Sequence, residues 1–351
     1  MTDLFALQDE IAASVVDAIK IRLAPGDRGV QPRPQLRNVE AYRHYLQGRF
    51  QRHTKNNVVL AMRSYEEATR LDPEHGMSWV GLAEAYVLST HYGLIRTVDG
   101  CARAREALAT AEHLQGDSPE AGYVEGFMAF MERRWAESSA AYYRVLEQRP
   151  NHVQTLGSFG ATLCVRQHFL EGKGLLDRCR DVDPLAAFPR ALTAMGLLAS
   201  GKPSEALRYC DDALSLEPDH MTAMWASGVA YIGLGRIDEA IARFERGLEL
   251  TRRSPFFIGL LGWGHALAGR TNEARALLNE LSARPSDAPR IGSDIWLLAA
   301  LGEIEKAFQE LARAEAEYQP FVYYTAFPGF DPLRSDPRFR ALLARLGLAV
   351  V

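Results

Sequence analysis

The chain has 351 residues, of which 47% are hydrophobic and 24% are charged. That length exceeds one ordinary hydrophobic core, so it predicts either two or three domains or a repeat array. No run of 18 or more apolar residues is available to span a bilayer, and 40 basic against 44 acidic side chains exclude the basic excess typical of nucleic-acid-binding proteins.

The amino-terminal residues MTDLFALQDE place acidic side chains where a secretory signal carries positive charge, and the sequence has no N-x-[ST] site. We therefore expect a cytoplasmic protein. The four cysteines form no C-x-x-C pair, which suits a reducing compartment and predicts small core hydrophobes instead of redox centres or zinc ligands. They are Cys101, Cys164, Cys179 and Cys210.

Two segments precede the main part of the chain. Residues 1–23 are predicted to form an amphipathic helix, because apolar residues from Leu4 to Leu23 recur at spacings of three and four. Such a helix is a candidate contact for a homodimer. Residues 24–37 contain three prolines and two glycines and are predicted to form a linker.

Small residues recur at a nearly constant interval through residues 38–318. Consecutive members of the series from Ala104 to Ala274 are 34 residues apart. Ala274 and Ala307 are 33 residues apart, and Ala61 and Ala104 are 43 residues apart. This period predicts eight units of helix, turn and helix, with an insertion after the first. The series comprises Ala61, Ala104, Ser138, Gly172, Ala206, Ala240, Ala274 and Ala307.

A second series of small residues keeps the same spacing in the predicted first helices. Small residues allow two helices to approach closely, so we expect the two series to meet inside each hairpin. Prolines end several units, and glycine-containing turns such as residues 233–236 separate paired helices. The second series comprises Ala83, Gly126, Gly160, Ala194, Gly228 and Gly262.

Residues 319–351 form a predicted extension that follows the repeats. Asp336 before Pro337 is a typical helix start, and the apolar residues behind it lie on one face. We expect this terminal helix to cover the end of the array. Its apolar residues are Phe339, Leu342, Leu343 and Leu346.

The spacing and the residues Trp79, Leu82, Ala83 and Tyr86 in one unit, with Gly228, Tyr231, Ala240 and Phe244 in another, resemble the tetratricopeptide repeat. The resemblance implies an all-α, right-handed superhelical solenoid of about eight helix-turn-helix repeats. Three segments, DLFALQDEIAASVVDAI at residues 3–19, NVEAYRHYLQGRF at 38–50 and FDPLRSDPRFRALLARLGL at 330–348, together resemble the C-terminal repeat region of bacterial regulators that carry a class III adenylate or guanylate cyclase domain or a winged-helix domain. In that family a catalytic or DNA-binding domain would precede Asp3.

Catalytic motifs are absent from the sequence. Gly172, Lys173 and Gly174 only hint at a phosphate loop, since Gln167 stands where its first glycine is needed. We therefore expect no enzyme activity, no cofactor and no metal. His75, His152 and His220 follow the unit-ending prolines, and we expect them to be solvated residues of separate turns.

First-helix side chains that point away from the partner helix line the concave groove of a stacked array. In units three to seven only one of the fifteen such positions, Glu120, is charged, so this face is apolar. We expect it to bind a partner's apolar peptide or helix or a segment of this chain, or else to be buried by tight curvature. The candidate groove residues are Tyr123, Phe127, Phe188, Met195, Trp225, Val229, Phe256, Trp263 and Trp296.

The sequence thus favours a regulatory protein-interaction scaffold, either part of a cyclase-type signalling protein or derived from one. The alternative hypothesis is a receptor whose groove senses a small apolar molecule or a peptide pheromone.

Overall fold

The computed structural model describes residues 38–53, 57–285 and 288–348. Residues 40–351 form one compact unit. The predicted helix at 1–23, the linker at 24–37 and the proposed dimer contact lie outside the described residues.

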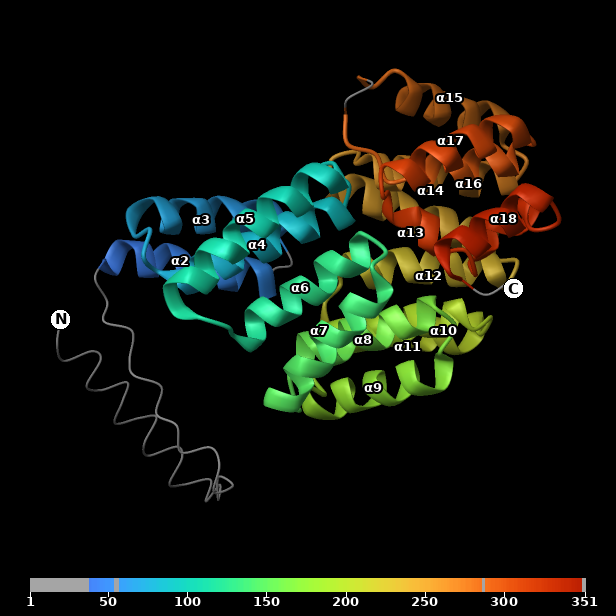
Figure 1. The fold of residues 1–351 in the computed structure, drawn as a ribbon. Coiled ribbons are helices and arrows are strands. Elements are labelled where there is room, and N and C mark those ends of the chain that lie inside the picture. The colour runs from blue at the N-terminus through green and yellow to red at the C-terminus, as the bar shows by residue number, and fades with distance from the viewer. Residues whose placement is uncertain (1–37, 54–56, 286–287, 349–351) are drawn as a thin grey trace. The chain divides into compact units, whose positions relative to one another are not determined.

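Within the described part of the chain, helices alternate with short turns over the whole repeat region (Figure 1). From α4 onward each even-numbered helix packs against the odd-numbered helix that follows it, and α2 meets α3 through Tyr45 and Tyr65. These eight hairpins build an all-α, right-handed superhelical solenoid, as predicted. The helices are α2 (Val39–His53), α3 (Val58–Leu71), α4 (Gly76–His91), α5 (Thr97–Gln115), α6 (Pro119–Met131), α7 (Trp135–Gln148), α8 (Val153–Val165), α9 (Phe169–Val182), α10 (Ala187–Ala199), α11 (Pro203–Leu216), α12 (Met221–Gly233), α13 (Ile237–Leu250), α14 (Pro255–Leu267), α15 (Thr271–Ser282), α16 (Ser293–Ala300) and α17 (Ile304–Ala316).

The two series of small residues meet inside the hairpins, which confirms the prediction from their spacing. In α6 and α7 the Ser138 hydroxyl donates a 2.8 Å hydrogen bond to the Gly126 carbonyl oxygen. In α8 and α9 a Cβ added to Gly172 would lie only 2.7 Å from the carbonyl oxygen of Gly160. Larger side chains at these positions would force the paired backbones apart.

Each of the later hairpin turns passes through one residue with left-handed backbone geometry. Gly235 and Gly269 take this conformation with φ of 73° and 72°. The equivalent residues of the α6–α7 and α8–α9 turns are Arg133 and Gln167, with φ of 58° and 65°. A side chain in this region of backbone space is strained, whereas glycine is not.

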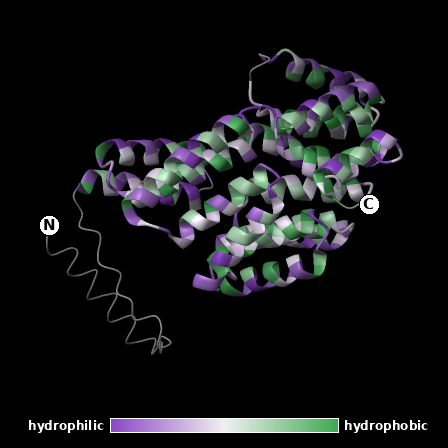
Figure 2. Ribbon diagram, in the orientation of Figure 1, coloured by the Kyte–Doolittle hydropathy of each residue, from purple (hydrophilic) through white to green (hydrophobic). Residues whose placement is uncertain are grey.

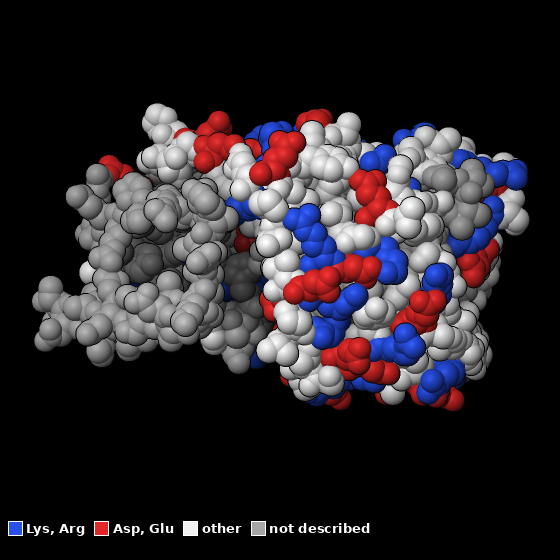
Figure 3. Space-filling model, turned by 90° about the horizontal axis from the view of Figure 1, so that it is seen from below, with Lys and Arg blue, Asp and Glu red and all other residues white. Residues whose placement is uncertain are grey.

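The even-numbered helices form the inner layer of the array, and consecutive members from α4 to α12 contact one another. From α4 onward they are more apolar than the odd-numbered helices, which carry apolar residues on one face and polar residues on the other, as outer, half-exposed helices do (Figure 2). Figure 3 shows basic and acidic side chains interspersed over one outer face. The inner layer is therefore the surface on which apolar binding chemistry is concentrated.

The chain continues after α17 into η1 (Pro320–Tyr323), η2 (Pro328–Leu333) and α18 (Pro337–Leu346). We call residues 319–348 the C-terminal segment. The predicted helix start is confirmed, because the Asp336 side chain accepts a 2.8 Å hydrogen bond from the backbone N–H of Arg338. The four predicted apolar residues of α18 are buried.

Candidate binding site on the concave face

The C-terminal segment packs its aromatic residues onto the even-numbered helices. The Trp225 ring of α12 lies 5.1 Å from Tyr324 and 5.9 Å from Phe327, and the Trp296 ring of α16 lies 4.6 Å from Phe321. Part of the predicted groove is thus occupied by the chain's own C-terminal segment, which was one of the occupants expected from the sequence.

The same segment reaches the third hairpin. The rings of Tyr323 and Phe130 lie 4.6 Å apart, and the Arg133 guanidinium lies 4.4 Å from the centre of the Tyr318 ring. Arg133 also donates a hydrogen bond to the carbonyl oxygen of Glu315. Contacts across more than 180 residues therefore join α6 and the α6–α7 turn to the end of the array.

The nine predicted groove residues divide into two groups. One cavity is lined by five of them, Tyr123, Phe127, Phe188, Met195 and Trp225. The other four do not line it: Phe256 contributes to a smaller neighbouring pocket, and Val229, Trp263 and Trp296 are at most 2% exposed in the packed interior. Only Phe188 and Phe256 are half-buried, and the other seven are buried.

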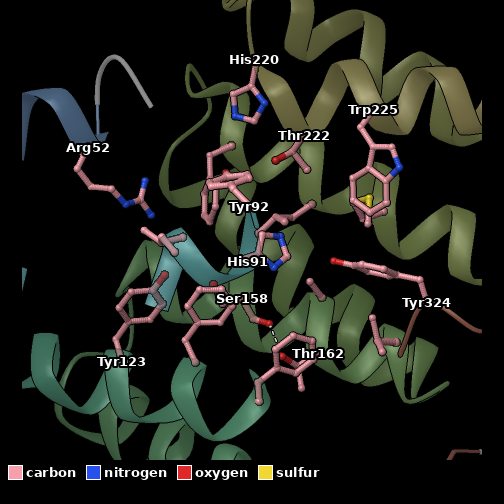
Figure 4. A pocket seen from close by; sticks show the side chains of 18 residues that line it. Arg52, His91, Tyr92, Tyr123, Ser158, Thr162, His220, Thr222, Trp225 and Tyr324 are labelled. Atoms are coloured by element: carbon pink, nitrogen blue, oxygen red, sulfur yellow. Dashed lines mark hydrogen bonds between the residues drawn. The ribbon is translucent and has the colours of Figure 1, made fainter. Parts of the chain in front are cut away.

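The larger cavity has a volume of about 100 Å³ and lies on the inner face of α4, α6, α8, α10 and α12 (Figure 4). Arg52 of α2 and Tyr324 of the C-terminal segment also contribute to its lining. Spacing within the repeats predicted four aromatic residues of this lining, Tyr123, Phe127, Phe188 and Trp225. It missed Arg52, His91, Tyr92, His220 and Tyr324, because these residues lie in unit one, at the end of α4, at helix caps or beyond the repeats. It also missed Ser158, which lies within α8 but outside the first-helix positions predicted to face the groove.

Arg52 is the charged residue of this lining. Its Nε lies 3.0 Å from Oε1 of Glu84, and both residues are 8% exposed. The two atoms form an ion pair but not a well-directed hydrogen bond. Burial by itself lowers the pKa of Arg52, yet the neighbouring Glu84 carboxylate raises that pKa above its usual value, so the guanidinium stays charged.

Two histidines of the lining are held neutral by burial. Burial lowers the pKa of His91 and that of His220 to about 4. The Nδ1 atom of His220 accepts a 3.3 Å hydrogen bond from the backbone N–H of Ala223, so in the neutral ring the proton resides on Nε2. The Nδ1 atom of His91 has no hydrogen-bond partner among the described residues.

The expectation that His220 is a solvated turn residue was wrong, since the side chain is only 5% exposed. His220 and His152 instead cap α12 and α8, because each accepts a backbone N–H from three residues ahead. A histidine after a unit-ending proline can therefore serve as a buried helix cap, a role that sequence composition alone does not indicate.

The four cysteines are free and buried, as predicted. Burial raises the pKa of the Cys101, Cys164 and Cys179 thiols to about 12, which keeps them protonated.

Gly172, Lys173 and Gly174 lie within α9, so they form no phosphate-binding loop. Over the described residues there is no group of three side chains suited to a metal ion, and no helix there has the length and apolar character to cross a membrane.

Sequence comparison identifies repeats in the middle of the array, where residues 197–255 match the tetratricopeptide repeat family. A TPR repeat-containing protein of Methanocaldococcus jannaschii is 36% identical over 88 residues, which are 25% of this chain and 26% of that protein. The transcriptional regulator HilA of Salmonella paratyphi A is 21% identical over 289 residues, which are 79% of this chain and 44% of HilA. The chain thus spans about a quarter and under half of these relatives.

Two solved structures that resemble this chain are described as tetratricopeptide repeat proteins. A tetratricopeptide repeat protein from Parabacteroides merdae has a TM-score of 0.47 at 14% identity, covering 76% of this chain and 98% of that chain. YrrB, described as a TPR protein with an unusual peptide-binding site, has a TM-score of 0.32 at 18% identity, covering 52% and 90%. Residues 197–255 therefore carry tetratricopeptide repeats, and helical hairpins continue on both sides of them.

Proposed function

We propose that this chain is a protein-interaction scaffold that binds an apolar segment of a partner protein on its concave face. Solenoids of this kind present extended concave surfaces for binding. One observation carries the proposal: this face buries an aromatic segment already, with Phe321, Tyr324 and Phe327 packed on Trp225. A surface that accommodates one apolar segment offers suitable chemistry for another beside it.

The exposed surface of two apolar side chains on α10 indicates where a partner would bind. Phe188 is a predicted groove residue that is only half-buried, and it stands at the cavity, next to Leu192, which is also half-buried. A partner's apolar side chains would bury the remaining surface of these residues, and each large side chain fully buried contributes about 1.5–3 kcal/mol. The partner would therefore approach over α10.

The repeats are also proposed to belong to a bacterial-type regulator. This extension rests on the resemblance of the two ends of the chain to such regulators, as described from the sequence. Sequencing the gene upstream of Met1 tests it. A continuous reading frame that encodes a cyclase or winged-helix domain would support it, and an in-frame stop codon directly before Met1 would refute it.

Site-specific photocrosslinking tests the scaffold proposal. A photoreactive phenylalanine at position 188 should form an adduct with one partner protein in cells, and excess unlabelled chain should compete with it. The matched control places the same residue at Leu170 on α9, which is 89% exposed. Equal adducts from both positions, or no adduct at position 188, would contradict the proposal.

A further inference from the structure

The cavity beside α10 is too small for a helix or an extended peptide. Its volume of about 100 Å³ is of the order of the cavities that hold a single six-membered ring. It is partly walled by the chain's own Tyr324, so its shape is defined without a partner protein. These dimensions fit a small molecule better than a polypeptide.

The lining is suited to a flat apolar body. Seven of the eighteen lining residues are aromatic, and Leu88, Val165, Leu192 and Met195 add aliphatic or thioether surface. Aromatic walls favour a ring, because offset and edge-to-face contacts add to the energy of burial. The aromatic residues are Tyr92, Tyr123, Phe127, Phe130, Phe188, Trp225 and Tyr324.

The polar groups of the lining are mainly donors. Asp, Glu and Lys are absent from the eighteen residues, and the one charged group is the Arg52 guanidinium, which Figure 4 shows directed from α2 toward the other lining side chains. Its Nε faces Glu84, and Arg52 also interacts with the Tyr123 side chain, so an acceptor oxygen of a ligand would share the terminal amino groups with that hydroxyl. Neutral His220 carries its proton on Nε2, and the Trp225 indole N–H is a buried donor without a partner among the described residues.

A ligand for this cavity must therefore supply acceptors. A cationic ligand would meet a guanidinium and no carboxylate of the lining, so it is disfavoured. An oxygen acceptor beside Arg52 would receive charge-assisted hydrogen bonds, which are roughly twice as strong as those between neutral groups.

We infer that this cavity is a binding site for a small molecule made of one apolar ring and an oxygen acceptor, such as an aromatic carboxylate or the corresponding amide. The ring would lie among Phe127, Phe188 and Trp225, and the oxygen would lie beside Arg52. This site goes beyond the proposed scaffold function, since it needs no partner protein.

Titration of the purified full chain tests the inference with three probes of one size: benzoate, benzamide and benzylamine. We expect benzoate and benzamide to bind in calorimetry or ligand-observed NMR, and benzylamine to bind at least tenfold more weakly. Binding of benzylamine with equal affinity, or of none of the three, would overturn the inference. Because no partner is present, this outcome is independent of the crosslinking experiment.

Two kinds of variant locate the site. Ala161→Phe should fill the cavity and abolish binding, while Ala109→Phe on exposed α5 surface should leave binding unchanged. The double variant Arg52→Gln with Glu84→Gln removes the ion pair without leaving an unpaired charge, and it should weaken benzoate at least tenfold. If Ala161→Phe does not fold, Ser158→Leu narrows the same cavity from α8. Unchanged benzoate affinity in the folded cavity variants would overturn the assignment.

Discussion

The indole Nε1 of Trp135 donates a 2.7 Å hydrogen bond to the carbonyl oxygen of Leu346, although 211 residues separate them in the sequence. Trp135 begins α7 of the third hairpin, and Leu346 ends α18. This bond and the contact of the Tyr323 ring with Phe130 fasten the C-terminal segment to the third hairpin, and Arg133 holds the end of α17 there through Glu315 and Tyr318. The fold is consequently more than a stack of neighbouring repeats, because its C-terminal end packs against the third of its eight hairpins.

Trp135→Phe should therefore loosen α18 selectively. The variant keeps an aromatic ring but loses the indole donor, and an intramolecular hydrogen bond contributes about 0.5–1.5 kcal/mol. We expect a loss of that size in the free energy of unfolding, with faster amide hydrogen exchange in residues 337–348. Trp79→Phe is the matched control, since its indole bonds locally to the carbonyl oxygen of Pro73 at 2.9 Å. Equal exchange in α18 for both variants would argue against the fastening role.

Deleting residues 331–351 should lower the melting temperature and promote aggregation. The deletion removes Phe339, Leu342, Leu343 and Leu346, which are at most 5% exposed, and uncovers the surface beneath them. Each such side chain contributes about 1.5–3 kcal/mol when fully buried. Thermal unfolding and light scattering measure the effect.

The control for this deletion is the double variant Arg338→Ala with Arg345→Ala. It removes the ion pairs of α18 with Glu305 and Glu315 but keeps the apolar face, and exposed ion pairs contribute little to stability, so the melting temperature should change far less than in the deletion. A deletion variant that stays monomeric with an unchanged melting temperature would show that α18 is no cap.

Stability should fall between pH 6.5 and pH 4, in part because of His220. Its pKa in the folded chain is lowered to about 4 by burial, from an ordinary value of 6.5, so the unfolded chain binds the proton more readily. The contribution is complete above pH 6.5 and is lost as pH falls toward 4; at pH 5 the loss is about 2 kcal/mol. Chemical denaturation at several pH values measures this slope.

His220→Asn separates this effect from other titrations. Asparagine keeps a side-chain oxygen for capping α12 but does not titrate in this range. The variant should be less pH-dependent than the parent between pH 6.5 and 4. An identical slope in parent and variant would assign the pH dependence to other groups.

The sequence predicted the hairpins because small residues at a 34-residue period report directly on helix contacts, as Ser138 and Gly126 do. The repeat period could not predict the contacts of residues that are not at repeating positions. Arg52 and Tyr324 reach the concave face only through the superhelical path of the backbone and the return of the chain after α17. Long-range packing of this kind depends on the sum of small inter-repeat rotations, which no local pattern encodes.

Gln167→Gly should stabilise the chain. Gln167 adopts φ of 65° at the turn where later hairpins have glycine, and a side chain in this conformation is strained. Relief of that strain is partly offset by the greater flexibility of glycine in the unfolded chain, so we expect a net gain of about 0.5–1 kcal/mol. The reverse change, Gly235→Gln, should destabilise by a similar amount in the same denaturation assay. A destabilised Gln167→Gly variant would show that contacts of this side chain outweigh the backbone strain.

Trp225 and Trp263 are the two groove residues that we expect from the sequence to anchor a partner most strongly, because tryptophan dominates binding at interfaces, and two single variants test this expectation. Trp263 is 2% exposed and contacts Phe244 and Trp296, so Trp263→Ala should cost about 3–5 kcal/mol of stability, as for other buried tryptophans.

Trp225 is 3% exposed but lines the cavity, packs on Tyr324 and leaves its indole N–H unbonded. Trp225→Phe keeps most of the packing and loses the donor, so it should weaken partner capture or ligand binding with a small change in melting temperature. If Trp263→Ala melts like the parent while capture is lost, Trp263 is an anchor after all. If Trp225→Phe changes neither binding nor stability, the functional surface lies away from Trp225.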